Sequence, residues 1–208
     1  MQMSQKEYIN PFSQVSEIYA QKLDDASMSG DIVLLEQLVC EIERTLPDVD
    51  AASQARLYYS IGTVYSDVAQ AKSLSHEKSI RKQLYAFRKS VGIIEDEEYS
   101  KEEYGPYVNP FKCLLYTNYG NTLCSCGRNI EAIAQYKKAI NIYPLFGMAI
   151  GNLGRVYQDY GVMDYDDGHQ DYFHYFAYSL LKKAVECKDP NTHKACLLYT
   201  SPSPRDQR

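Results

Sequence analysis

The sequence contains no tryptophan and has no excess of positive charge. Its aromatic residues are 20 Tyr and 6 Phe in a chain of 208 residues. The formal net charge is −5, and the Lys and Arg residues are not gathered into a basic stripe. A surface that follows a phosphate backbone needs concentrated Lys and Arg, so we expect no direct nucleic-acid binding by this segment.

Long hydrophobic runs are also absent. No stretch of about 18 apolar residues is present to span a membrane, and the first residues, MQMSQKEYINPF, lack the apolar core of a signal peptide. We therefore expect no membrane association and a cytoplasmic location. The cysteines are scattered along the chain and are expected to be reduced thiols. They are Cys40, Cys113, Cys124, Cys126, Cys187 and Cys196.

Sequence motifs for catalysis are missing as well. The chain has no G-x-x-x-x-G-K-[ST], no H-E-x-x-H and no G-x-S-x-G. The pair Cys124-x-Cys126 lacks the C-x-x-C spacing of redox and zinc sites, and no second pair completes it. We read these two cysteines as small packing residues. The sequence therefore predicts neither an enzyme active site nor a bound cofactor in this segment.

The most regular part of the chain is Cys113–Pro144. Eight small or apolar residues there have the spacing of two antiparallel helices joined by a short turn. Counted from Cys113, positions 4, 7, 8, 11, 20, 24, 27 and 32 are Tyr116, Tyr119, Gly120, Leu123, Ala132, Tyr136, Ala139 and Pro144. The small residues suit a close helix crossing, the Tyr and Leu side chains fill the seam, and the proline ends the second helix.

A second copy of this pattern follows at once. Gly154 lies 34 residues after Gly120, and Ile150, Leu153 and Tyr157 repeat the apolar positions around it. Cys113–Tyr157 therefore resembles the tetratricopeptide repeat (TPR) family. The resemblance implies an all-α fold, a right-handed superhelical solenoid of antiparallel helix pairs.

In that family the first helices of successive repeats line a concave groove, into which positions six and nine point. The matching residues here are Asn118 and Asn121 in the central repeat, and Asn152 and Arg155 in the next. Asparagine can hydrogen-bond the backbone of an extended peptide, and arginine can hold a carboxylate. The resemblance thus implies partner binding through these four residues. The alternative is that they hydrogen-bond adjacent helices or solvent.

The remaining sequence suggests further helix pairs on either side. Residues 8–50 predict an N-terminal helical hairpin, with Val15, Ile18, Tyr19 and Leu23 on the apolar face of its first helix. Residues 51–195 predict about three repeats, at 51–94, 109–144 and 147–187. The first and third are longer than the central one. We expect the extra residues in Lys72–Glu77 and in a loop within Gly161–Tyr175.

Two segments are not expected to belong to the folded part. Glu95–Tyr104 is a run of charges and reads as a solvated helix end and linker. Cys196–Asp206, CLLYTSPSPRD, resembles the conceptual translation of a sequencing adapter, so residues 196–208 are set aside as an artefactual tail. The alternative is a Pro-rich recognition segment. We expect the chain to be a fragment that continues beyond Ala195 in the natural protein.

Acidic residues and histidines crowd the enlarged third repeat, which raises the possibility of a metal site. They are Asp164, Asp166, Asp167, His169, Asp171 and His174. Starting from Asp164, an EF-hand would need its glutamate at the twelfth position, which is Tyr175. His169 and His174 are five residues apart, a spacing that separates them around a helix. We therefore expect no metal there, and an acidic, aromatic-rich loop or a partner contact instead.

These observations predict a protein–protein interaction scaffold that binds a protein or peptide. A second hypothesis comes from another resemblance: the Tyr-rich, enlarged repeats resemble those of bacterial TPR proteins that carry a C-terminal HEPN domain, a family of RNases. The motif of that domain, Arg followed four to six residues later by His, does not occur in residues 1–195. Any such activity would lie in a following domain, and this segment would then be its sensor or regulator.

Overall fold

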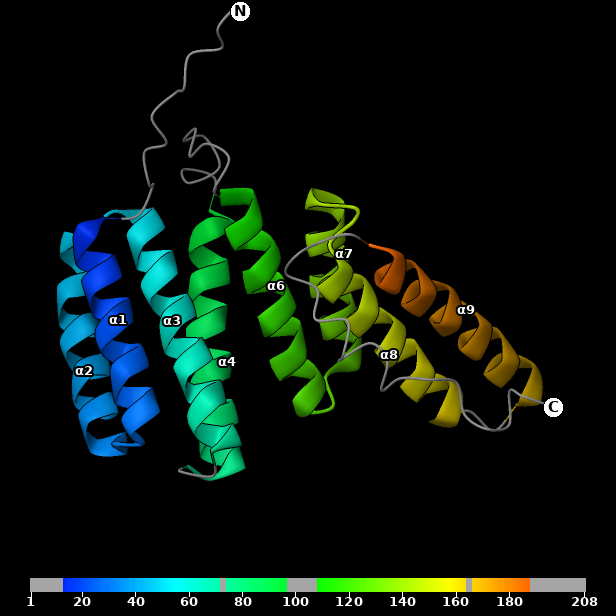
Figure 1. Ribbon diagram of the computed structural model, residues 1–208, viewed down its shortest axis with the longest axis horizontal. Helices are drawn as coiled ribbons and strands as arrows, with labels where there is room; N and C mark the ends of the chain where they lie inside the picture. Colours follow the sequence, from blue (N-terminus) through cyan, green and yellow to red (C-terminus); the bar gives the residue numbers. More distant parts are fainter. Residues whose placement is uncertain (1–12, 72–73, 97–107, 164–165, 188–208) are drawn as a thin grey trace, which may run out of the picture. The chain divides into compact units, whose positions relative to one another are not determined.

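The computed structural model describes residues 13–71, 74–96, 108–163 and 166–187, and every regular element in these ranges is helical. The chain separates into two compact units, Met1–Pro110 and Phe111–Arg208, which are described one at a time (Figure 1). None of the described helices combines the length and apolar character needed to cross a membrane. The 196–208 tail and most of the predicted charged linker lie outside the described residues.

The first unit begins with the predicted N-terminal hairpin. Its helices are α1 (Gln14–Ser29) and α2 (Ile32–Thr45), followed by the short 3-10 helix η1 (Leu46–Asp48). Gly30 ends α1 in the left-handed conformation, with φ of 70°. The carboxylate of Asp31 then accepts a hydrogen bond from the Leu34 amide and caps α2. This turn was predictable because both residue types favour those positions.

The predicted apolar face of α1 is confirmed for Leu23, which is buried, and for Tyr19, which packs against the core, but it was wrong for Val15 and Ile18. Val15 and Ile18 are 45% and 51% exposed, whereas the buried side chains of α1 are Ser16, Ala20, Leu23 and Ala26. The small residues allow α1 to pack closely against the helix that follows the hairpin, α3 (Ala51–Gln70). Hydrophobic spacing alone favoured Val15 and Ile18, but close helix packing buried Ser16 and Ala20 instead.

The second hairpin of this unit pairs α3 with α4 (His76–Ile94). The two helices lie side by side in Figure 1 and make the most extensive packing of the unit. The buried core combines α1, α2, α3 and α4. Its largest fully buried side chains are Leu23, Leu35, Ile42, Leu57, Ile61, Val64, Tyr65 and Phe87.

The second unit also consists of two hairpins. Helix α6 (Val108–Ser125) pairs with α7 (Asn129–Ile142), and α8 (Gly147–Met163) pairs with α9 (Asp167–Glu186). Gly127 has a φ of 76° and ends α6, where the Arg128 amide donates to the Leu123 carbonyl. Helix α7 ends at Ile142, as expected from the proline that follows. Tyr143 and Pro144 then follow outside the helix.

One contact recurs in all three of the later hairpins, where a glycine of the first helix faces a large side chain of the second. A Cβ on Gly62 would lie 2.6 Å from the Phe87 ring, and one on Gly120 would lie 2.5 Å from the Tyr136 ring. A Cβ on Gly154 would lie 3.0 Å from Leu181. Each glycine therefore permits a close crossing that any side chain would obstruct. In the central hairpin these are positions eight and twenty-four of the predicted pattern, and the two longer hairpins keep the same kind of contact.

The predicted loop for the extra residues of the third repeat was wrong. The stretch 161–175 lies mainly in helix, because α8 continues to Met163 and α9 begins at Asp167. The extra residues of the 51–94 hairpin also lie largely in helix, since α3 runs to Gln70 and α4 starts at His76. Positions 72–73 and 164–165 are outside the described residues. The added length therefore lies mainly in longer helices.

Candidate partner-binding face

The four predicted contact residues are carried by α6 and α8 within the second unit. Asn118 and Asn121 are three residues apart on α6, and Asn152 and Arg155 are three apart on α8. This spacing puts the members of each pair on one side of their helix. The prediction that positions six and nine share a face within each helix therefore has a simple geometric basis.

The structure brings Asn121 and Asn152 into direct contact. The Asn152 Nδ2 donates a hydrogen bond of 2.8 Å to Oδ1 of Asn121. The same oxygen accepts a second hydrogen bond, of 2.9 Å, from the hydroxyl of Tyr136 on α7. Both lone pairs of the Asn121 carbonyl are therefore used within the protein. For the Asn121 carbonyl and the Asn152 amide, the structure therefore shows hydrogen bonds to adjacent helices, which was the alternative to partner binding.

Tyr136 is the buried anchor of this arrangement. Its side chain is 1% exposed and its ring covers Gly120, so the hydroxyl emerges beside Asn121. The Cys124 Sγ lies 3.6 Å from the same hydroxyl. The Tyr136 hydrogen points to Asn121, which leaves the thiol to donate. Burial, with a further contribution from Cys124, raises the pKa of Tyr136, and burial also raises the pKa of Cys124. Both groups are neutral near pH 7.

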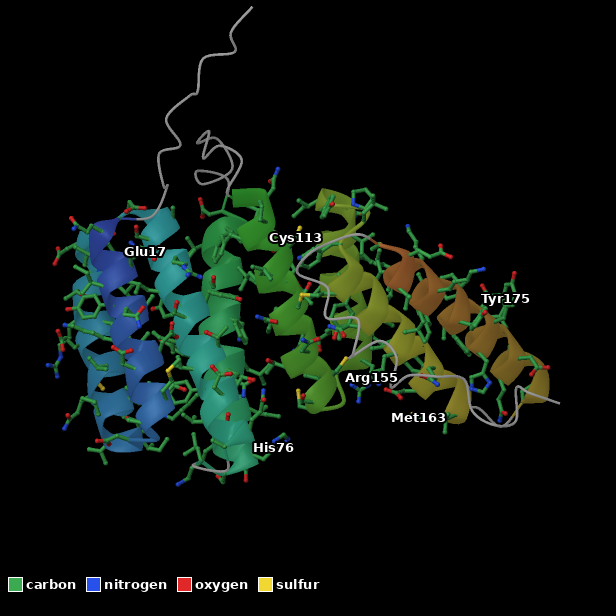
Figure 2. All side chains as sticks on the ribbon, viewed as in Figure 1. Glu17, His76, Cys113, Arg155, Met163 and Tyr175 are labelled. Atoms are coloured by element: carbon green, nitrogen blue, oxygen red, sulfur yellow. The ribbon has the colours of Figure 1, made fainter. Side chains whose placement is uncertain are left out.

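Arg155 supplies the charge of the face. It is exposed, and its label in Figure 2 places it on the side of α8. It takes part in no ion pair within the described ranges of the chain. Burial raises the pKa of Cys124, and the positive charge of Arg155 has a smaller, opposite effect. Arg155 therefore lies near the hydrogen bonds of Tyr136. Asn118 is half-buried one turn earlier on α6. Its backbone carbonyl accepts a hydrogen bond from the Thr122 hydroxyl.

Two participants were not predicted to belong to the face. Tyr136 was assigned only to the helix seam, and Cys124 only to packing. Tyr136 could have been identified because it is a tyrosine opposite the glycine of a close helix crossing. The hydroxyl of such a tyrosine must leave the seam next to the first helix of the pair. Nothing in the spacing of Cys124 would have indicated its hydrogen bond.

Asp166, one of the acidic residues near the start of α9, has a structural role. Asp166 is the N-cap of α9, and its carboxylate accepts a hydrogen bond of 3.1 Å from the His169 amide. This bond lowers the pKa of Asp166. No three His, Cys, Asp or Glu side chains are placed to hold a metal ion in the described part of the chain. Asp164 lies outside it.

The comparisons with known proteins give one short similarity. No family model matches the chain. A stretch of 55 residues is 38% identical to the human (Homo sapiens) protein named Protein O-mannosyl-transferase TMTC1, and the mouse (Mus musculus) protein of that name gives the same figures. The match covers 26% of this chain and 6% of the relative, so the chain corresponds to a small part of that protein. The similarity is compatible with an interaction scaffold. The transferase activity in the relative's name refers to that protein.

Proposed function

We propose that this chain is a protein-interaction module of the TPR type, which binds an extended peptide segment of a partner across α6 and α8. The observation that carries the proposal is the hydrogen bond between Asn121 and Asn152, which joins the first helices of two successive hairpins beside an exposed Arg155. The two helices thereby present one polar face.

The unused groups on this face match a peptide with a carboxylate. After the internal bonds are made, Asn121 still has its Nδ2 donor and Asn152 still has its Oδ1 acceptor. A donor and an acceptor at this distance suit the amide groups of an extended backbone. The guanidinium of Arg155 has donors for a carboxylate of the same peptide.

The TPR assignment is supported by the recurring glycine contacts of the three later hairpins. It includes the expectation that successive pairs stack as a right-handed superhelix, and that the module acts by binding rather than by catalysis. The assignment also explains the buried small residues at positions twenty and twenty-seven. Ala132, Ala139, Ala177 and Ala184 hold these positions in the second unit.

The proposal is tested by selecting peptides on the full chain from a random decapeptide display library. Selected peptides are then measured by fluorescence polarisation, as free acids and with their carboxylates amidated. Arg155→Ala should weaken binding about tenfold, because a hydrogen-bonded charge pair is lost. The matched control is Lys137→Ala, an exposed cation on α7 that should leave the affinity unchanged.

Asn152→Ala is a cleaner second variant than Asn121→Ala. Without Asn152, the Asn121 carbonyl keeps the hydroxyl of Tyr136 as a partner, so peptide binding should fall while stability changes little. Asn121→Ala would instead leave the buried Tyr136 hydroxyl without its acceptor and should cost about 1–3 kcal/mol of folding free energy. No enriched peptide, or equal affinities for wild type, Arg155→Ala and Asn152→Ala, would refute the proposal.

A further inference from the structure

A groove on the first unit is separate from the α6 and α8 face. It has a volume of about 640 Å³ and lies between the first turn of α3 and the second half of α4. The α4 side is a stripe with helical spacing. It consists of Tyr85, Arg88, Lys89, Gly92, Ile93 and Asp96. Ligand sites in proteins commonly have volumes in this range.

The floor of the groove is open at Gly92. A Cβ built there would meet nothing within 4 Å, and the residue is exposed in the last turn of α4. Glycine is a poor helix former, and no close crossing among the described residues requires it here, unlike Gly62. A glycine at such a place lets another backbone approach the helix closely. Ile93 and the ring of Tyr85 provide apolar surface on either side.

The charge of the lining is positive, in contrast to the chain as a whole. The lining contains two cations, Arg88 and Lys89, and one carboxylate, Asp96, whereas the formal charge of the full sequence is −5. The Lys89 Nζ lies 5.8 Å from the centre of the Tyr85 ring. Among the residues described, neither Arg88 nor Lys89 is engaged in an ion pair. The two cations can therefore hold carboxylates of a ligand.

We propose that this groove binds an extended acidic peptide, with carboxylates on Arg88 and Lys89 and an aliphatic residue over Gly92 and Ile93. The occupant is inferred from charge complementarity and from the space at Gly92. The proposal is independent of peptide binding by α6 and α8, because all the lining residues belong to the first unit.

The probe is a fluorescein-labelled, amidated hexapeptide with two Glu, then Leu and Val, then two Glu, added to the full chain. Arg88→Glu should weaken its binding about tenfold, because an attraction becomes a repulsion. The matched control is Lys78→Glu, an exposed cation on α4 outside the groove, which should leave the affinity unchanged. The same hexapeptide with Lys in place of Glu should not bind.

Gly92→Leu separates groove filling from unfolding. Leucine is a better helix former than glycine and meets open space, so the variant should keep or raise Tm while binding of the probe is lost. The proposal is overturned if Gly92→Leu binds normally, if the Lys peptide binds equally well, or if no binding is seen at any probe concentration up to the millimolar range. Full competition by equimolar inorganic phosphate would also overturn it, by indicating a small-anion site.

Discussion

Gly120→Ala is the substitution that most directly tests the packing of the central hairpin. An alanine should stabilise an ordinary helix interior by about 1 kcal/mol over glycine. Here, however, the new Cβ would lie 2.5 Å from one Tyr136 ring atom and 2.9 Å from two others. Carbon atoms prefer separations of about 3.5–4.0 Å, so the ring would have to move by about 1 Å.

The Tyr136 ring has little freedom to make this movement. It is 1% exposed, and its hydroxyl is bonded to Asn121 on the adjacent helix. Overpacking of this kind costs about 1–3 kcal/mol, and a weakened hydroxyl bond adds about 1 kcal/mol. Set against the gain in helix propensity, Gly120→Ala should lower the free energy of unfolding by about 1–3 kcal/mol.

The assay is urea unfolding followed by circular dichroism at 222 nm, since the chain has no tryptophan to report by fluorescence. Gly92→Ala is the matched control, because its Cβ meets open space and its urea midpoint should rise. A double-mutant cycle adds Tyr136→Ala, in which background Gly120→Ala should become neutral or stabilising. If Gly120→Ala raises the midpoint as Gly92→Ala does, or costs the same with and without the Tyr136 ring, the packing argument fails.

Two further predictions concern helix capping and tyrosine ionisation. Asp31→Ala should lower the free energy of unfolding in urea by about 1 kcal/mol, because this side chain caps α2. Ser75→Ala at the start of α4 should lower it little, because no side-chain cap bond forms there. Equal losses for the two variants would contradict this prediction. Burial, then the neighbouring Tyr58 and Glu43, raise the pKa of Tyr85 to about 12. The unfolded state therefore ionises first, and stability should fall as pH rises from about 10 through 12. Tyr85→Phe should flatten that fall in the urea midpoint and remove a late tyrosine step from the 295 nm titration; an unchanged titration curve would contradict the assignment.

The correct and incorrect predictions have distinct physical causes. Gly30, Asp31 and Gly127 are the residue types that such helix ends favour, because turn and cap chemistry depends on one or two neighbouring residues. The face of α1 was assigned correctly only in part, because burial depends on which helix lies opposite. Ser16 and Ala20 are buried where α1 comes close to α3, and the larger Ile18 is left outside.

The candidate site shows the same division. The four contact residues were selected by their register in the repeat, and the structure joins two of them, Asn121 and Asn152. The second partner of Asn121, Tyr136, was not predicted at this site, since a hydrogen bond between distant residues requires the crossing of α6 and α7 to be known. The predicted fusion to an effector domain concerns sequence outside this chain and stays a prediction.

Sequence alone determined that this protein is helical, that its helices come in pairs, and that glycine faces a bulky residue where the helices of a pair cross. These features follow from the local periodicity of apolar residues and from the size of single residues, both of which can be read directly from the sequence. Tertiary structure decided that the extra residues of the enlarged hairpins extend helices instead of forming loops, and that the Asn121 carbonyl is used internally while Arg155 remains open. Both outcomes depend on what packs against a side chain, and the spacing of residues does not contain that information.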